Sequence, residues 1–166
     1  MTSVLFLCTG NAARSVMAGM ALRACRPDLD VATAGTLTID GLPISWRTRA
    51  ALNAVGLSCP RHASRQAHAV DLDRSDLVIG LAPEHVSWVR REHPSAAVRT
   101  ATLVRLVDSL GAPPAPLADR LASLQLATVS LEPHEEVADP GGGDVEEFIA
   151  SARRIVRLVD QLAPRL

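Results

Sequence analysis

Short apolar runs alternate with longer segments of helical spacing along most of this chain. Residues 3–7 include four consecutive apolar side chains, which is typical of a strand buried on both faces of a sheet. Residues 144–162 instead repeat an apolar side chain at every third or fourth position, which predicts a long amphipathic helix. The same reasoning predicts strands at 30–34, 77–81 and 98–100, the last at a sheet edge, and helices at 13–24, 45–55, 83–91 and 103–110.

Strands and helices that alternate in this way form a parallel sheet covered by helices on both faces. The sequence therefore predicts an α/β fold with three layers, α/β/α, around a central four-stranded parallel sheet. A chain of 166 residues is short enough for one domain, so residues 1–166 are expected to form a single domain. Hydrophobic side chains make up 48% of the chain, which is enough to build its core. The stretch at about 111–133 begins Gly-Ala-Pro-Pro, and we expect it to be a surface insertion with one helix near 117–126.

The turn that follows the first strand combines a possible nucleophile with a possible anion-binding group. Backbone N–H groups in the first turn of a helix lack partners, and the helix dipole adds positive potential, so an oxyanion fits there. Gly10 and Asn11 can adopt the positive φ angles that let successive amides converge. Arg14 can hold two oxyanion oxygens at once, and the same positive field favours the reactive thiolate of Cys8. The predicted phosphate-binding loop is Cys8-Thr9-Gly10-Asn11-Ala12-Ala13-Arg14-Ser15.

Each of these residues also has a simpler interpretation. Cys8 could be a buried structural cysteine at the end of a strand, Arg14 a solvated helix residue and Ser15 a helix cap. The apolar strand before the loop, the Gly-Asn inside it and the helix after it favour the chemical interpretation. Cys8 would then attack a bound phosphorus, and Ser15 would donate a hydrogen bond to its sulfur.

Composition excludes several other classes of function. A net charge of −1 gives no basic field for nucleic acid. Three cysteines in a chain that begins directly in a strand favour reduced thiols and a cytoplasmic protein, and no segment is long enough to span a membrane. No cysteine or histidine spacing suggests a metal site, and no cofactor is expected.

With its context, the loop resembles the phosphate-binding loop of the low-molecular-weight protein tyrosine phosphatases, a family that shares this loop with thiol-dependent arsenate reductases. The resemblance runs through nearly the whole chain. The motifs that carry it are VLFLCTGNAARSVMA at 4–18, Ala34-Gly35-Thr36, Gly41-Leu42-Pro43, RHASRQ at 61–66, SDLVI at 75–79 and VADP at 137–140.

The resemblance implies a role for each matching residue. Cys8 would form a cysteinyl-phosphate, Arg14 would bind the equatorial oxygens, and Asp139 would protonate the leaving oxygen and later activate water. Asn11, Ser15 and His62 would hold the loop in shape. The phosphate would be bound along Thr9, Gly10, Asn11, Ala12, Ala13, Arg14 and Ser15.

The chain departs from the family pattern at the pocket. Ala13 stands where many members have a second cysteine, so a disulfide inside the loop is impossible. Gly141 and Gly142 replace two aromatic residues that commonly wall the pocket, and the other wall position falls near Leu37 or Thr38. A preference for phosphotyrosine therefore does not follow from the resemblance.

Three functions remain open on the sequence alone. The leading one is a phosphomonoester hydrolase that acts on a phosphorylated protein or a small aryl phosphate. The alternatives are an arsenate reductase coupled to a small thiol, such as glutathione or mycothiol, and a non-catalytic phosphate-binding module. The oligomeric state is open. Among the remaining residues, His85 is expected to be solvated and Trp46 to pack at least partly in the core.

Overall fold

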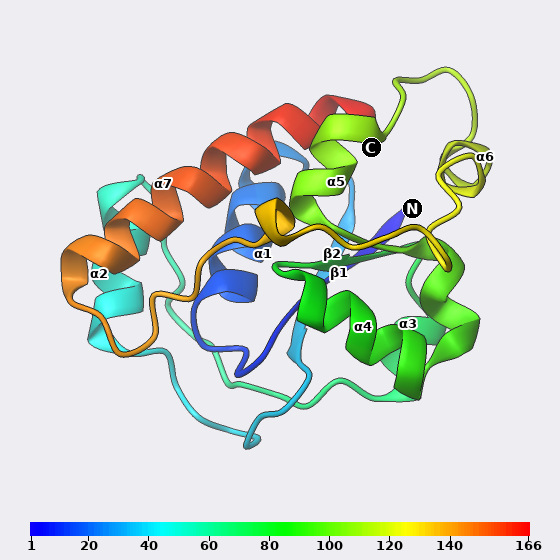
Figure 1. Cartoon of the computed structure of the whole chain (residues 1–166). Helices are drawn as coiled ribbons and strands as arrows, with labels where there is room; N and C mark the ends of the chain where they lie inside the picture. Colours follow the sequence, from blue (N-terminus) through cyan, green and yellow to red (C-terminus); the bar gives the residue numbers. More distant parts are fainter.

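The computed structural model describes all 166 residues and has the predicted three-layer α/β/α architecture (Figure 1). Its four strands are all parallel and lie in the order β2-β1-β3-β4. β1 therefore has a neighbour on each side, and the turn after it opens at the middle of the carboxyl edge of the sheet. The strands are β1 (Ser3–Cys8), β2 (Asp30–Gly35), β3 (Leu77–Gly80) and β4 (Thr100–Thr102).

The unbroken apolar run of β1 has a structural reason. Successive side chains of a strand point to opposite faces, and here both faces are buried. Val4 and Phe6 belong to a core cluster of 31 buried residues, whereas Leu5 and Leu7 belong to a second cluster of 8. Cys8 continues the first series and belongs to the larger cluster.

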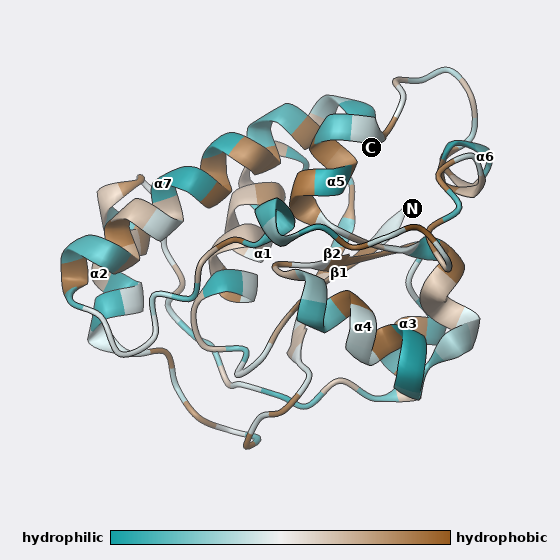
Figure 2. Ribbon diagram, viewed as in Figure 1, coloured by the Kyte–Doolittle hydropathy of each residue, from teal (hydrophilic) through white to brown (hydrophobic).

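Helices cover both faces of the sheet. One face carries α1 and α7, with α2 and α5 packed beside α7, and α3 and α4 cover the other. Figure 2 shows brown strands at the centre, while α7 alternates between brown and teal, as the amphipathic pattern requires. The helices are α1 (Arg14–Cys25), α2 (Trp46–Ala54), α3 (Ala69–Asp73), α4 (Pro83–Glu92), α5 (Leu103–Ser109), α6 (Leu117–Ala122) and α7 (Val145–Leu162).

Several helix ends follow from local sequence chemistry. Ser45 caps α2 by accepting a hydrogen bond from the backbone N–H of Thr48, at 3.2 Å. Gly56 lies just beyond α2 with a φ of 75°, a conformation that glycine adopts without strain. Asp144 caps α7, and its carboxylate accepts from the N–H of Glu147 at 3.1 Å. These boundaries confirm the predicted starts and stops.

Two predicted elements need correction, and one helix was missed. The strand expected at 98–100 is wrong by two residues, because Pro94–Arg99 form a 3₁₀ helix and the ladder with β3 uses Thr100–Thr102. The helix expected at 117–126 already ends at Ala122. Helix α3 was not predicted, since its five residues are too few to show a helical repeat.

Helix α6 lies at the amino edge of the sheet, away from the end of β1 that carries Cys8. Leu117 and Leu121 of α6 line a surface hollow together with Met1 and Thr2, which precede β1. The insertion therefore sits beside the start of the chain. None of the helices combines the length and the hydropathy needed to cross a membrane.

Candidate active site

The loop between β1 and α1 carries the predicted nucleophile at one end and the predicted arginine at the other. Cys8 is the last residue of β1 and is buried, and Arg14 is the first residue of α1. Asn11 has a φ of 49°, as expected, whereas the positive φ expected at Gly10 is wrong. The left-handed turn of the loop is thus made by Asn11.

The buried side chain of Asn11 ties the loop to three other parts of the chain. Its Nδ2 donates to the hydroxyl oxygens of Ser15 and Thr33, both at 3.0 Å, and its Oδ1 accepts from the N–H of Arg65 at 3.1 Å. The Ser15 hydroxyl lies 3.0 Å from the sulfur of Cys8. Because the Ser15 oxygen already accepts from Asn11, its proton is free to be donated to that sulfur.

Three consecutive carbonyl groups of the loop are held by side chains that lie outside it. None of the backbone N–H groups from Thr9 to Ser15 donates to a protein acceptor. The loop therefore presents a set of free donors at a helix N-terminus, which is the arrangement that binds oxyanions. The three carbonyl groups and the side chains that hold them are Gly10 O with Thr38 Oγ1 (2.7 Å), Asn11 O with His62 Nε2 (2.7 Å) and Ala12 O with Thr48 Oγ1 (2.9 Å).

Arg14 links this loop to the distant segment that carries Asp139. Its side chain is only 3% exposed, and its Nη1 donates to the carbonyl oxygen of Val137 at 3.1 Å. Its Nη2 forms an ion pair with Asp139 Oδ2 at 3.0 Å. The Asp139 side chain is 55% exposed, and its other oxygen accepts from the N–H of Gly141 at 2.9 Å. A carboxylate thus stands at the pocket mouth, directly on the guanidinium.

These groups surround a pocket of about 270 Å³. Its floor is Cys8 and the loop, and its rim includes Asp139 and Gly141. Phe148 is the aromatic side chain in its wall, and it comes from α7 rather than from either expected wall position. The lining residues are Cys8, Gly10, Ala12, Ala13, Arg14, Ser45, Thr48, Asp139, Gly141 and Phe148.

The loop packs tightly against the end of β2 because Gly35 has no side chain. A Cβ atom at this position would lie 2.5 Å from the carbonyl oxygen of Thr9, far inside contact distance. The same carbonyl accepts a hydrogen bond from the N–H of Leu37 at 3.1 Å. Gly35 therefore lets the backbone after β2 support the loop from the side.

His85 supports the loop from behind, so the expectation that it is solvated is wrong. It lies in α4, is fully buried, and its Nε2 is 3.1 Å from the hydroxyl oxygen of Thr9. Burial, together with the charge of Arg14, lowers the pKa of His85 to about 3. The imidazole is therefore neutral at pH 7, and its contact of 3.4 Å with Glu84 is not an ion pair.

The low pKa of His85 makes the free energy of unfolding depend on pH in the acid range. An unfolded histidine gains its proton near pH ~6.5, whereas folded His85 resists it down to about pH 3, so unfolding takes up a proton between these values. Below pH 6.5 this residue is expected to lower the free energy of unfolding by up to about 1.4 kcal/mol per pH unit. Urea unfolding at pH 7 and pH 4 measures the effect. His85→Gln is the control and should lose less stability; equal losses would contradict this account.

Trp46 lies outside the core, which corrects the expected packing. Its side chain is 63% exposed at the start of α2, next to Ser45 of the pocket wall, and the Arg47 guanidinium lies 5.2 Å from its ring centre. Leu37, at one expected wall position, is 79% exposed. Trp46 and Leu37 therefore stand outside the pocket, and Phe148 is the one large apolar side chain that lines it.

Sequence reasoning named one residue that supports the loop from outside, His62, whose Nε2 lies 2.7 Å from the carbonyl oxygen of Asn11, and missed the others. Each is a small polar or aromatic side chain distant from the loop in sequence, and only the cap motif at Ser45 placed one of them, Thr48, near a helix start. No group of three or more His, Cys, Asp or Glu side chains could hold a metal ion. The missed residues are Thr33, Thr38, Thr48, His85 and Phe148.

The family model described as low molecular weight phosphotyrosine protein phosphatase matches residues 3–113. The chain belongs to this family. A protein-arginine-phosphatase from Geobacillus stearothermophilus is 26% identical over 164 residues, which cover 98% of this chain and 95% of that protein. The probable low molecular weight protein-tyrosine-phosphatase AmsI from Erwinia amylovora is 30% identical over 98 residues, which cover 59% of this chain and 68% of AmsI.

Solved structures agree with this membership. The YwlE arginine phosphatase from G. stearothermophilus superposes with a TM-score of 0.79 at 26% identity, over 98% of this chain and 91% of that one. The low molecular weight protein tyrosine phosphatase from T. tengcongensis also gives 0.79 at 26% identity, over the full length of both chains. This family member is accordingly a cysteine-dependent phosphatase of a class that needs no metal.

Proposed function

We propose that this phosphatase removes phosphoryl groups from proteins, with Cys8 as nucleophile, Arg14 as the oxyanion-binding side chain and Asp139 as the proton donor and acceptor. One observation carries the proposal: a buried sulfur, a row of unpaired amides and a guanidinium bound to a half-exposed carboxylate meet at the carboxyl end of β1. A module that only binds phosphate needs neither the sulfur nor the carboxylate.

In the first step the thiolate of Cys8 attacks phosphorus and a sulfur–phosphorus bond forms. The bond to the leaving atom breaks, its electron pair stays on that atom, and Asp139 gives the atom a proton. The free amides from Thr9 to Ser15 and the fork of Arg14 stabilise the charge on the non-bridging oxygens. The product of this step is a cysteinyl-phosphate.

In the second step water attacks the cysteinyl-phosphate while Asp139 takes the proton of the water. The sulfur–phosphorus bond breaks and its electron pair returns to Cys8. The Ser15 hydroxyl, held 3.0 Å from the sulfur, donates to this departing thiolate. Asn11 and His62 keep the loop and Ser15 in place through their hydrogen bonds. The chemistry requires a reduced thiol, which suits the cytoplasm.

A phosphorylated arginine side chain is our second candidate substrate, beside phosphotyrosine. The likeness to the protein-arginine-phosphatase spans nearly the whole chain, and the protein tyrosine phosphatase from T. tengcongensis matches over the full length at the same 26% identity, so both substrate classes occur among the full-length relatives. Gly141 supplies no aromatic face to the pocket wall, so the aromatic side chain left for a phenyl ring to stack on is Phe148 of α7. The carboxylate of Asp139 would suit a departing guanidine, which it could protonate and bind.

Two phosphopeptides of the same sequence, one with phosphoarginine and one with phosphotyrosine, test the proposed phosphatase activity and the second candidate substrate. We expect the wild type to release phosphate from each, with the higher kcat/KM for phosphoarginine. A preference of more than about tenfold for phosphotyrosine would remove the second candidate and keep the first. No release from either peptide by a cooperatively folded protein would contradict the proposed function. Arsenite formed by the same protein from arsenate and glutathione would instead support the small-thiol-coupled reductase, for which the single thiol of the loop is sufficient.

A further inference from the structure

The chain reaches Asp139 through a segment without α-helix or strand, residues 126–139, here called the strap. In Figure 1 it runs in yellow and orange across the carboxyl edge of the sheet, and it includes the 3₁₀ helix Pro133–Glu135. Arg90 of α4 fixes its beginning, since Nη2 donates to the carbonyl oxygens of Leu126 and Val129 at 2.5 and 2.8 Å. The later part of the strap is fixed by a different arginine.

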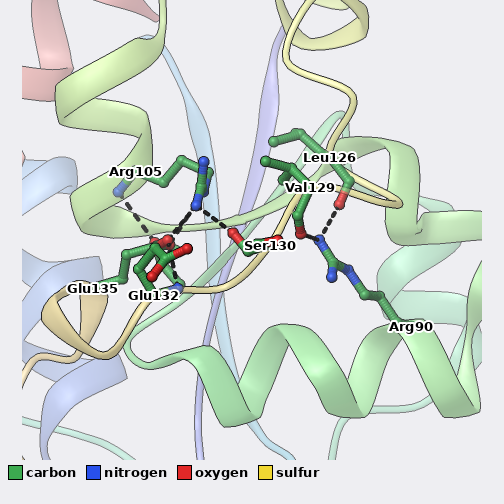
Figure 3. A network of polar contacts seen from close by, with 8 residues as sticks. Arg90, Arg105, Leu126, Val129, Ser130, Glu132 and Glu135 are labelled. Carbon is green, nitrogen blue, oxygen red and sulfur yellow. Dashed lines mark hydrogen bonds and ion pairs between the residues drawn. The ribbon is translucent and has the colours of Figure 1, made fainter.

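A buried ion pair between Arg105 and Glu135 holds the middle of the strap (Figure 3). Arg105 belongs to α5, and both its Nε and its Nη2 donate to the carboxylate of Glu135, which is 1% exposed. The hydroxyl of Thr102 donates to the same carboxylate, and so does the N–H of Glu132, at 3.0 Å. Arg105 Nη2 also donates to the carbonyl oxygen of Ser130 at 2.6 Å.

The ion pair between Arg105 and Glu135 keeps the carboxylate of Glu135 ionised and also fixes its orientation. Burial raises the pKa of Glu135, but the hydrogen bonds from Arg105 and Thr102 outweigh burial, and the net shift is downward. Glu135 therefore stays ionised at neutral pH. Two donors of one planar guanidinium on one carboxylate leave little freedom of rotation, so the backbone at Glu135 is held in one position relative to α5.

The strap crosses the carboxyl edge of the sheet one strand at a time. Glu135 is bound to Thr102, the last residue of β4. Val137 donates its N–H to the carbonyl oxygen of Leu81, immediately after β3, at 2.8 Å, and accepts from Arg14 at the end of the β1 loop. Asp139 then reaches the same guanidinium. The ion pair between Arg105 and Glu135 thus fixes the backbone position from which the strap continues to Val137 and Asp139.

Asp139 has few constraints of its own. Its side chain contacts Arg14 and the N–H of Gly141, and it is 55% exposed. Beyond it, Gly141 to Gly143 supply no side chain that could pack, and Gly142 has a φ of 82°. A bound oxyanion would compete with Asp139 for Arg14. During reaction the position of Asp139 then depends on the strap before it.

We propose that Arg105 and Glu135 are positioning residues for the acid, holding the strap so that Asp139 stays within reach of the leaving atom while Arg14 binds the phosphoryl group. The inference rests on the role of Asp139 in the proposed function. It places no group of the pair in contact with substrate.

The test is the dependence of kcat/KM on the leaving group, measured with aryl phosphates from phenyl phosphate to 2,4-dinitrophenyl phosphate. A poor leaving group needs the acid and a good one does not. Arg105→Met is expected to lose about tenfold with phenyl phosphate and less than about twofold with 2,4-dinitrophenyl phosphate, since a misplaced acid loses part of its typical 10²–10⁴-fold contribution. Inhibition by inorganic phosphate should change by less than about twofold, and Arg105→Lys should recover part of the loss.

Matched variants separate this inference from other outcomes. Arg90→Met removes the arginine of α4 that holds the start of the same strap, and it should leave the leaving-group dependence unchanged. A steepening as large as in Arg105→Met would overturn the assignment to the pair. Equal losses of Arg105→Met with both substrates would also overturn it. Asp139→Asn must itself steepen the dependence. If Asp139→Asn does not, the acid role in the proposed function fails instead. If Arg105→Met does not fold, Glu135→Gln takes its place with the same expectations.

Discussion

Replacing Cys8 with serine is expected to lower the turnover of p-nitrophenyl phosphate by roughly 10⁴-fold or more, the scale on which removal of a catalytic nucleophile acts elsewhere. A serine hydroxyl is not ionised at neutral pH, and the site has no general base beside residue 8 to activate it, since its neighbour Ser15 is itself a hydroxyl. Serine has nearly the same shape, and the buried site keeps its amides and Arg14. Steady-state kinetics measures the loss.

Affinity for inorganic phosphate, measured by calorimetry, should change in the Cys8→Ser variant by only a few-fold. Cys59→Ser is the matched control, because Cys59 is also buried but its sulfur hydrogen-bonds only to the carbonyl of Arg61, outside the loop. It should retain nearly full activity. Substantial turnover by Cys8→Ser, or an equal loss in Cys59→Ser, would refute Cys8 as the nucleophile.

Arg14→Lys is expected to lower kcat/KM by about 10²–10³-fold, as loss of a donor to a transition-state oxyanion does. Lysine keeps the charge but not the planar fork, so it cannot bind two oxygens at once. It also cannot hold both Val137 and Asp139 as the two nitrogens of Arg14 do. The inhibition constant for inorganic phosphate measures the loss of oxyanion binding, and kcat/KM for p-nitrophenyl phosphate measures the loss of catalysis.

Arg23→Lys on the same helix provides the comparison for Arg14→Lys. Arg23 lies in the last turn of α1 and donates to the carbonyl of Val31, away from the pocket. Its replacement should cost little activity. If Arg14→Lys lost no more than Arg23→Lys, the guanidinium would not be the oxyanion-binding group.

The sheet could be predicted from sequence because its buried strands are short runs of apolar residues. An apolar run such as Val4–Leu7 has few alternatives to a strand buried on both faces, and the caps at Ser45 and Asp144 mark helix starts. Strand β4 was misplaced because its Thr-Ala-Thr is short and weakly apolar. Its position is fixed by pairing with β3, which no local pattern reveals.

The loop residues could also be placed from sequence, because they are contiguous and their spacing is itself the signal. Of the side chains that support the loop from outside, only His62 was named, through the resemblance, and the others could not be. Thr38 and Thr48 approach the loop from separate segments, and a single threonine in either carries no distinguishing pattern. His85 was misjudged because its burial depends on α4 packing close to Gly80, where a Cβ would lie 3.0 Å from that of His85. Such contacts appear only once the chain is folded.

Helix α6, which precedes the strap, lies beside Met1 and Thr2, at the opposite edge of the sheet from Cys8. Arg90 and Arg105 bind the chain after it has left this region, so little of what happens there is passed on to Asp139. The exposed residues 111–116 therefore offer a place to graft an affinity tag or a fluorophore onto a working phosphatase.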